Sequence, residues 1–315
     1  MSLRANTAGE DRTRRRTRTR RRPSERPSPT TSTRTILEGV SLMAVIGHSM
    51  ALLSLVAVWL PATGSADVLA GIEGVYDLPA SFPTDNSPVV LILDTQHPDK
   101  IRSEMKKPGG YSYMPKLKKM ATELSGLRSL AVHYTQFGRA DLKKLNVKAV
   151  ILTARERRID PSYDQELFAL IRETAIPTIG FCGGHHLIAQ AYGAKTGLMR
   201  PLRDGEKDTH PEYHPGQFKE WGFMPVKVVK RDPLFDGLPD LIVVREMHAF
   251  HLTDLPAEFD VLASTDECRI QAIKHRDKPL YGTQFHAEHY DDKHLDGKAV
   301  LRNFFRIAGL PARPR

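Results

Sequence analysis

Short apolar runs alternate with segments of helical periodicity through the middle of this chain. The apolar runs are the expected strands and lie at Val89–Asp94, Leu130–Tyr134, Ala149–Thr153 and Thr178–Phe181. The helical patterns lie at Tyr113–Leu127, Ala140–Leu145, Pro161–Thr174 and His185–Tyr192. Strands that lack polar positions are buried on both faces, as in a parallel sheet covered by helices. The alternation therefore predicts an α/β fold with a parallel sheet between two helical layers.

The pattern changes after about residue 220, where short strand-like segments are separated by turn residues. The segments are Phe223–Val229, Leu241–Arg245, Asp260–Ser264 and Arg269–Lys274, and a last helix is expected at Lys298–Ala308. Short strands joined by turns are typical of antiparallel pairing. We therefore expect a linker at residues 67–87, followed by one domain at 88–310 with antiparallel strands added to a mainly parallel sheet.

The basic charge of the chain is concentrated at its start. Residues 1–35 hold 11 of the 46 Lys and Arg residues and 3 of the 37 Asp and Glu residues, and so carry most of the net charge of +9. The remainder is nearly neutral, which argues against a basic nucleic-acid-binding domain and predicts no nucleic-acid partner. Residues 1–38 have too few apolar side chains for a core and are expected to form a disordered Arg-rich leader.

An apolar segment at residues 39–66 follows the leader. Its apolar run is followed by small residues ending at Ala66, which is typical of a secretory signal cleaved after Ala66. Uncleaved, a run of this length would form a membrane anchor. The sequence predicts an exported or membrane-anchored protein that contacts the membrane only through residues 40–60. The alternative is a cytoplasmic protein whose translation starts at Met43 or Met50.

One cysteine lies at a glycine-rich junction between an expected strand and an expected helix. The segment Gly180-Phe181-Cys182-Gly183-Gly184 has the form G-x-C-x-G. This spacing is typical of a nucleophile elbow, in which glycines permit a strained turn and a close backbone approach. A helix that begins near Gly183 directs the positive end of its dipole at Cys182, which favours the thiolate. The Gly183 amide can donate to an oxyanion, and Cys182 is the candidate nucleophile.

A histidine and a glutamate near the end of the chain can supply the base. We expect a strand to end at His286, with Glu288 two residues later on the same side of the chain. The carboxylate can then accept a hydrogen bond from one imidazole nitrogen while the other nitrogen faces the sulfur. The sequence predicts a triad of Cys182, His286 and Glu288.

Two segments resemble the signature blocks of class I glutamine amidotransferases. They are Gly180-Phe181-Cys182-Gly183-Gly184-His185 and Gly282-Thr283-Gln284-Phe285-His286-Ala287-Glu288, and Trp221–Val226 and Pro233–Pro239 resemble the region between them. The resemblance implies a flavodoxin-like three-layer sandwich with a Cys-His-Glu triad. It also implies that the thiolate attacks the side-chain amide of glutamine, releases ammonia and forms a glutamyl thioester that water hydrolyses.

Three positions depart from that family's pattern. The resemblance implies a Gly-Gly pair where this chain has Ala154-Arg155, and a glutamine where it has His186. It implies Ser-His-Gly-Asp where the chain reads Met247-His248-Ala249-Phe250. Ala154, Arg155, His186 and His248 are therefore the expected oxyanion and substrate-binding positions beside Gly183. Because these positions are altered, we expect poor recognition of free glutamine, unless Arg155 replaces the lost partner of its carboxylate.

We expect neither a metal nor a cofactor. His210 and His214 are separated by a proline that breaks helical geometry, and they and His289/His294 are expected to be solvated loop histidines. The chain carries no glycine-rich phosphate loop of either standard form. The second cysteine, Cys268, is expected to pack in or near a strand.

Three functions remain open at this point. The chain can be a glutaminase that acts on a small-molecule amide and passes ammonia to a partner enzyme. It can be an exported hydrolase or peptidase that uses the same triad on γ-glutamyl compounds, with water as the acceptor. It can also be a non-enzymatic binding domain that keeps the fold, although such a domain has no need of all three triad residues.

Overall fold

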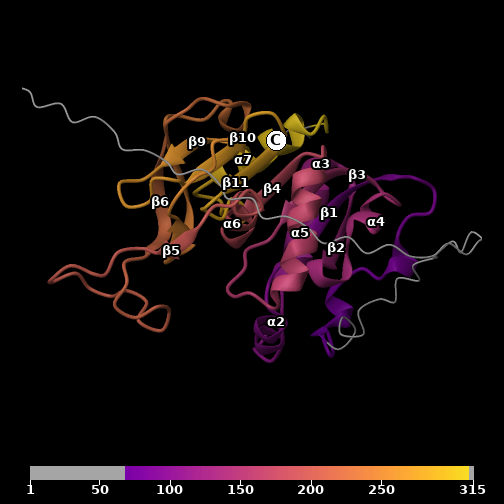
Figure 1. The fold of residues 1–315 in the computed structure, drawn as a ribbon, viewed down its shortest axis with the longest axis horizontal. Helices are drawn as coiled ribbons and strands as arrows, with labels where there is room; N and C mark the ends of the chain where they lie inside the picture. Colours follow the sequence, from indigo (N-terminus) through magenta and orange to yellow (C-terminus); the bar gives the residue numbers. More distant parts are fainter. Residues whose placement is uncertain (1–67, 312–315) are drawn as a thin grey trace, which may run out of the picture. The chain divides into compact units, whose positions relative to one another are not determined.

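A mixed sheet forms the centre of the computed structural model, which describes residues 68–311 (Figure 1). Within these residues the sheet has nine strands in the order β2-β1-β3-β4-β11-β10-β9-β6-β7. The predicted leader at residues 1–38 and the apolar segment at 39–66 lie outside the described residues.

Five neighbouring strands of this sheet run parallel. They are β2 (Arg128–His133), β1 (Pro88–Asp94), β3 (Asn146–Leu152), β4 (Thr178–Phe181) and β11 (Leu280–Thr283). Taken in chain order, the five have the 2-1-3-4-5 arrangement of flavodoxin-like folds. Strand β4 is buried at every position and β1 at every position after Pro88. The predicted α/β fold with a flavodoxin-like sheet is confirmed.

The other strands extend the sheet in antiparallel fashion. They are β10 (Ala272–His275), β9 (Phe259–Ser264), β6 (Glu220–Val228) and β7 (Leu241–His248). Burial alternates along β7, so that Glu246 and His248 share the buried face with Ile242 and Val244. A separate two-stranded sheet pairs β5 (Thr196–Leu198) with β8 (Phe250–Leu252).

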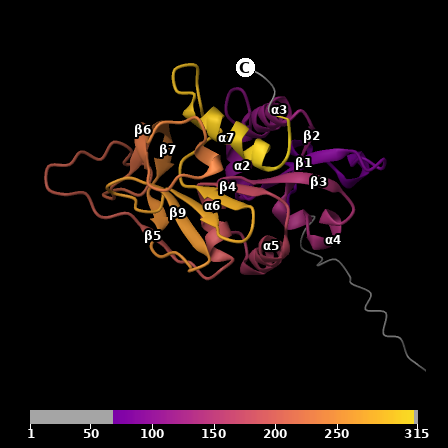
Figure 2. The ribbon, with the colours of Figure 1, turned by 90° about the horizontal axis from the view of Figure 1, so that it is seen from above.

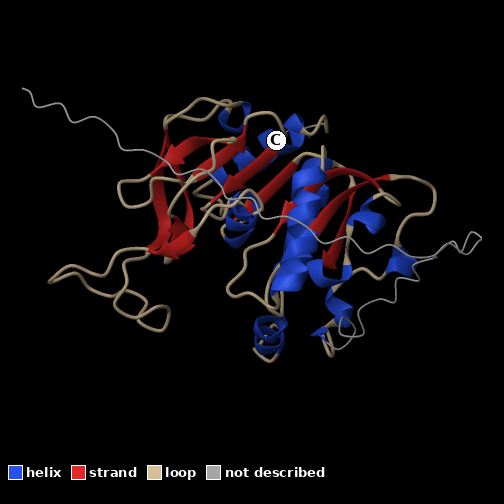
Figure 3. Ribbon diagram, in the orientation of Figure 1, coloured by secondary structure: helices blue, strands red, loops and turns tan. Residues whose placement is uncertain are grey.

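Helices cover both faces of the sheet, as Figures 2 and 3 show. On one face lie α3 (Tyr113–Ser125) and α7 (Asp296–Ile307), whose apolar side chains join one buried cluster. On the other lie α5 (Pro161–Glu173) and α6 (Gly183–Gln190), which join a second cluster. Burial of these amphipathic faces supplies most of the stability of such a sandwich. None of the helices within 68–311 combines the length and apolar composition needed to cross a membrane.

Several elements differ from the sequence prediction, and β5 and β8 are two strands that it did not include. A helix that was not predicted, α2 (Pro98–Met105), begins after His97, whose ring accepts from the Asp99 amide. Pro98 at the first helical position was the available signal. The short helix α4 covers only Arg139–Leu142. Strand β11 ends at Thr283, so His286 lies in the following loop, where its amide donates to the Arg245 carbonyl at 2.8 Å.

The segment expected to be a linker packs against the domain. Leu69, Ile72 and Tyr76 are buried in the same cluster as α3 and α7. Their spacing of three and four residues places them on one side of a turn that includes the short helix Glu73–Val75. The Tyr76 hydroxyl donates to Asp94 at the end of β1 over 2.9 Å. Residues 69–76 of the predicted linker at 67–87 therefore contribute to the core.

Candidate active site

The turn that carries Cys182 has the strained backbone of an elbow. Cys182 connects β4 to α6 with φ 47° and ψ −103°, a conformation that L-residues rarely adopt. Its amide donates to the Thr283 carbonyl at 2.8 Å, and its own carbonyl accepts from the His186 amide at 3.0 Å. Strain of this kind is typical of sites where a side chain must be presented at a fixed angle.

Glycine is required beside Cys182 because other backbone lies too close. A β-carbon on Gly183 would lie 2.2 Å from the Arg155 nitrogen, and one on Gly184 would lie 2.4 Å from the Leu152 carbonyl oxygen. The loop that follows β3 therefore lies directly against the elbow. The backbone nitrogens of Gly183 and Arg155 lie near one another, as an oxyanion-binding pair requires.

The departure at Ala154-Arg155 causes no backbone strain. Among the described residues, the non-glycine residues with positive φ are Asn86, Cys182 and His214. Ala154 and Arg155 thus adopt ordinary conformations in the loop where the family pattern has two glycines. Replacement of the two glycines therefore carries no cost from a positive φ in this loop.

His286 and Glu288 form a buried ion pair. His286 Nδ1 lies 2.8 Å from Glu288 Oε1, and both side chains are almost fully buried. Burial disfavours the charged imidazole, but the Glu288 carboxylate and the Cys182 sulfur raise the pKa of His286 well above its usual range. Burial likewise opposes the Glu288 charge, yet His286 lowers the pKa of that carboxyl. The three predicted triad residues therefore lie together.

Tyr113 is a part of this cluster that sequence reasoning did not find. Its hydroxyl donates to Glu288 Oε1 at 3.1 Å from the start of α3, 175 positions earlier in the chain. Its ring also packs against His289, with the ring centroids 5.6 Å apart. Burial and the Glu288 charge raise the pKa of Tyr113, so the hydroxyl keeps its proton and can donate. No local motif around Tyr113 signals this contact.

Two further side chains, Gln284 and His186, form a chain of hydrogen bonds that ends at the Cys182 sulfur. The Gln284 side-chain nitrogen Nε2 donates to Cys182 Sγ at 3.6 Å, and Gln284 Oε1 lies 2.8 Å from His186 Nε2. Burial lowers the pKa of His186 to about 4, so its imidazole is neutral at physiological pH. His186, an expected substrate-binding position, therefore lies near Cys182 through Gln284, and its Nε2 bonds to protein.

The Arg155 side chain is also bound within the protein. Its guanidinium lies 2.6 Å from Asp164 Oδ1, and both side chains are largely buried. Arg158 pairs with the other oxygen of Asp164 at 2.7 Å. The alternative in which Arg155 replaces the lost partner of a substrate carboxylate is therefore not supported, because its charge is already paired.

His248 lies in a buried carboxylate pair. Its Nε2 is 2.9 Å from Glu220 Oε2 and 3.2 Å from Glu246 Oε2, while its Nδ1 is 3.0 Å from the Phe250 carbonyl oxygen. Burial opposes the positive charge, but the two carboxylates raise the pKa of His248 to about 10. This histidine is thus a buried cation bound to protein oxygens, and a direct contact with substrate is not indicated.

Within residues 68–311, two groups of side chains could supply metal-ligand atoms. Glu220, His248 and Cys268 form one group and His286, Glu288 and His289 the other, with the donor atoms of each group within 4.8 Å of one another. In each group a histidine already bonds to a carboxylate. His248 and His286 therefore already have carboxylate partners within the protein.

The loop histidines considered from the sequence contact aromatic rings. His210 stacks on Trp221 with ring centroids 4.1 Å apart, and His214 meets Phe250 edge-on at 4.9 Å. His294 stacks on Phe223 at 3.9 Å. The expectation that these three rings are simply solvated is corrected, since each packs against an aromatic side chain.

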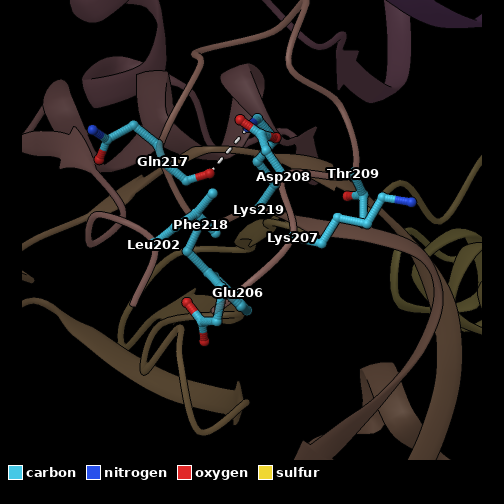
Figure 4. A pocket seen from close by; sticks show the side chains of 8 residues that line it. All are labelled: Leu202, Glu206, Lys207, Asp208, Thr209, Gln217, Phe218 and Lys219. Atoms are coloured by element: carbon cyan, nitrogen blue, oxygen red, sulfur yellow. Dashed lines mark hydrogen bonds and ion pairs between the residues drawn. The ribbon is translucent and has the colours of Figure 1, made fainter. Parts of the chain in front are cut away.

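Two hollows lie near these loops. One, of about 180 Å³, is lined by the loop before β6, including Lys219 and Asp208, which form an ion pair at 2.7 Å (Figure 4). The residues labelled there include none of the predicted site residues. The other, of about 470 Å³, is lined by residues of α3 together with Glu288, His289 and Tyr290. It therefore borders the carboxylate end of the triad.

Comparison with known proteins finds a matching family and several relatives. The family described as glutamine amidotransferase class-I matches residues 132–308. One subunit of the glutamine-hydrolysing GMP synthase of Pyrococcus abyssi is 31% identical over 169 residues, covering 54% of this chain and 80% of the relative. The GMP synthase of Clostridium novyi is 32% identical over 177 residues, covering 55% of this chain but 30% of that protein.

A solved structure is similar in fold. The crystal structure of a Thermoplasma acidophilum protein, described as a GMP synthase subunit, aligns with a TM-score of 0.54 at 23% identity, covering 71% of this chain and 94% of that one. At this identity the likeness concerns the fold alone.

The comparisons correct the predicted location. The apolar pattern of residues 40–60, which lie outside the described residues, led to the expectation of an exported or membrane-anchored protein. The relatives from Pyrococcus and Clostridium are GMP synthases or subunits of one, and they lend no support to export or anchoring.

Proposed function

The chain belongs to the glutamine amidotransferase class-I family, and from this premise we propose that it hydrolyses a side-chain amide through a thioester on Cys182. The observation that carries the proposal is the strained Cys182 elbow beside the buried pair of His286 and Glu288. A domain that only binds a ligand has no need of a strained cysteine with a paired base.

The proposed reaction begins with proton transfer from the Cys182 thiol to His286. The thiolate attacks the amide carbonyl carbon, and the backbone amides of Gly183 and Arg155 stabilise the negative oxygen. As the tetrahedral intermediate collapses, the carbon–nitrogen bond breaks and His286 gives its proton to the departing ammonia. Water, deprotonated by His286, then attacks the thioester, releases the carboxylic acid and restores the thiol.

Glu288 keeps the imidazole in the orientation that this reaction needs. Because Nδ1 of His286 bonds to the carboxylate, Nε2 is left for the proton exchanged with sulfur, ammonia and water. The buried carboxylate also stabilises the imidazolium that forms in each half-reaction.

The relatives and the geometry of the site favour different amides as the substrate. The relatives are named as glutamine-hydrolysing, which favours glutamine. The Arg155 charge is paired with Asp164 and His186 Nε2 bonds to Gln284, so neither group is left to bind an α-carboxylate. This observation favours a second candidate, an amide that lacks a free α-carboxylate, as a better substrate than glutamine.

We also propose that an ammonia-accepting partner enzyme works with this chain. The relative from Pyrococcus abyssi is named as one subunit of a synthase, which implies a further subunit in that protein. Co-purification with a synthetase, and ammonia release that rises when the partner is added, would support a shared reaction.

An assay of the released ammonia or amine tests the proposed hydrolysis. The purified full chain is given glutamine, γ-glutamyl compounds or other amides, and the Cys182→Ala variant serves as the matched blank. Release of ammonia or amine from at least one of them by the unmodified chain, and from none by the variant, is the expected result. A binding domain would release neither from any amide.

A further inference from the structure

We propose that His186 and Gln284 form a hydrogen-bonded line that presents an N–H group to the Cys182 sulfur. His186 is then a positioning residue that orients Gln284, and it does not contact substrate. The inference rests on the proposed function only in treating Cys182 as the nucleophile. It gives His186 and Gln284 a part in stabilising the Cys182 thiolate.

The contacts that carry this inference are consecutive. His186 Nε2 lies 2.8 Å from Gln284 Oε1, and Gln284 Nε2 lies 3.6 Å from Cys182 Sγ, an ordinary distance for a bond to sulfur. Gln284 is fully buried and His186 half-buried. The carboxamide of Gln284 therefore has a protein partner at each end.

The backbone fixes the three residues relative to one another. His186 lies in the first turn of α6, where its amide donates to the Cys182 carbonyl at 3.0 Å. Gln284 follows Thr283, whose carbonyl accepts from the Cys182 amide at 2.8 Å. The Gln284 amide itself donates to the Gln271 carbonyl at 2.7 Å. Each end of the line thus rests on backbone bonded to, or adjacent to, the nucleophile.

The protonation state of His186 decides which end of Gln284 faces the sulfur. A carboxamide has an acceptor end and a donor end. A neutral imidazole that bonds to Oε1 must carry its proton on Nε2, and the NH₂ group of Gln284 is then directed at Cys182. An N–H donor stabilises a thiolate, whereas a carbonyl oxygen in its place would accept from the thiol and stabilise that form.

The charges around His186 favour its neutral state. Burial has the largest effect on the pKa of His186 and disfavours a second proton on the ring. The hydrogen bond to Gln284 acts in the opposite direction, but His248, Arg155 and His251 act in the same direction as burial, and the pKa falls to about 4. The ring therefore stays neutral over the range in which a thiol titrates, and the orientation of Gln284 is constant across that range.

Alkylation of Cys182 in the full chain tests the inference without any substrate. The rate of reaction with iodoacetamide is measured from pH 5 to 10, and mass spectrometry of the modified peptide separates Cys182 from Cys268. Gln284→Glu places a carboxylate oxygen against the sulfur, and we expect its profile to move to higher pH, with alkylation at least about tenfold slower at pH 7. His186→Phe keeps a ring but removes the donor, and we expect a shift in the same direction.

Two further variants make the result specific. His186→Gln supplies another N–H group near Oε1, and we expect it to restore the profile of the unmodified chain. Gln190→Ala changes a side chain on the same helix that bonds to Thr196, so it should leave the profile unchanged. Thermal melting verifies that each variant folds.

Unchanged alkylation profiles in both His186→Phe and Gln284→Glu, measured on folded protein, would overturn the inference, with or without loss of hydrolysis. Failure of the proposed function has a different signature. In that case Cys182 of the unmodified chain is alkylated with the expected dependence on His186 and Gln284, but no amide is hydrolysed.

Discussion

The backbone nitrogen of Arg155 lies 2.2 Å from the point that a β-carbon on Gly183 would occupy. Contacts of this kind with backbone cannot be relieved by a side-chain rotation, so the elbow and the loop after β3 must move apart if Gly183 gains a methyl group. The positions of Cys182 and of the two expected oxyanion donors, the amides of Gly183 and Arg155, therefore depend on residue 183 having no β-carbon.

Gly183→Ala should therefore abolish hydrolysis and lower the free energy of unfolding by about 1–3 kcal/mol through overpacking. Steady-state kinetics and chemical denaturation measure the two effects. Gly74→Ala is the matched control, since a β-carbon there meets nothing within 4 Å and the change should alter neither quantity.

Cys182→Ala should eliminate both turnover and labelling by a glutamine-like electrophile. Cys268→Ala should preserve labelling, because burial and the nearby Glu220 and Glu246 charges raise the pKa of the Cys268 thiol and keep it protonated. Mass spectrometry of the labelled chain identifies the modified cysteine. Comparable labelling of Cys268 would contradict the assignment of the nucleophile.

Tyr113→Phe should reduce kcat by roughly tenfold, because Glu288 loses a hydrogen bond to its charged form and holds His286 less firmly. The same change should shift the acidic limb of the rate profile, which a purely structural role would leave in place. Tyr111→Phe is the control, since the Tyr111 hydroxyl donates to Asp94 and contacts no triad residue. Equal behaviour of the two variants would remove Tyr113 from the active site.

The buried cation His248 predicts a pH dependence of stability. Its folded pKa of about 10 is above that of the unfolded chain, so the stabilisation is complete below about pH 6.5 and is lost as the pH rises toward 10. Within this window one proton contributes a slope of about 1.4 kcal/mol per pH unit. Denaturation at several pH values, compared with His248→Gln, isolates this slope. A variant whose slope matches that of the unmodified chain would show that His248 is neutral.

Arg155→Ala should lower stability by about 1–3 kcal/mol and leave KM nearly unchanged, because the guanidinium pairs with Asp164 and the backbone amide is retained. Arg158 remains on the other carboxylate oxygen and limits the loss. Kinetics with the preferred amide and a thermal melt provide the two measurements. A large rise in KM at unchanged stability would instead make Arg155 a substrate ligand.

The parallel strands and the elbow could be predicted from the sequence because each depends on local pattern. An apolar run identified β1, and the glycine spacing around Cys182 identified the turn before α6. Fully buried strands and tight turns restrict residue choice at every position, so their signals are strong.

The roles of individual polar side chains could not be predicted in the same way. His186 and Arg155 were expected to contact substrate, yet their partners are Gln284, 98 positions away, and Asp164. Tyr113 reaches Glu288 across 175 positions. Such pairings depend on how the helices are placed on the sheet, which the local sequence does not encode.

The residues ahead of β1 affect how a shortened form of this protein can be made. Asp77 accepts hydrogen bonds from the Ala131 amide and from Lys118, in addition to the bond between Tyr76 and Asp94. A fragment that begins at Pro88 would lack these hydrogen bonds. It would also expose the apolar surface that Leu69 covers and would therefore be prone to aggregation. An expression fragment meant to stay in solution should therefore start before Val68, about twenty residues ahead of the first strand.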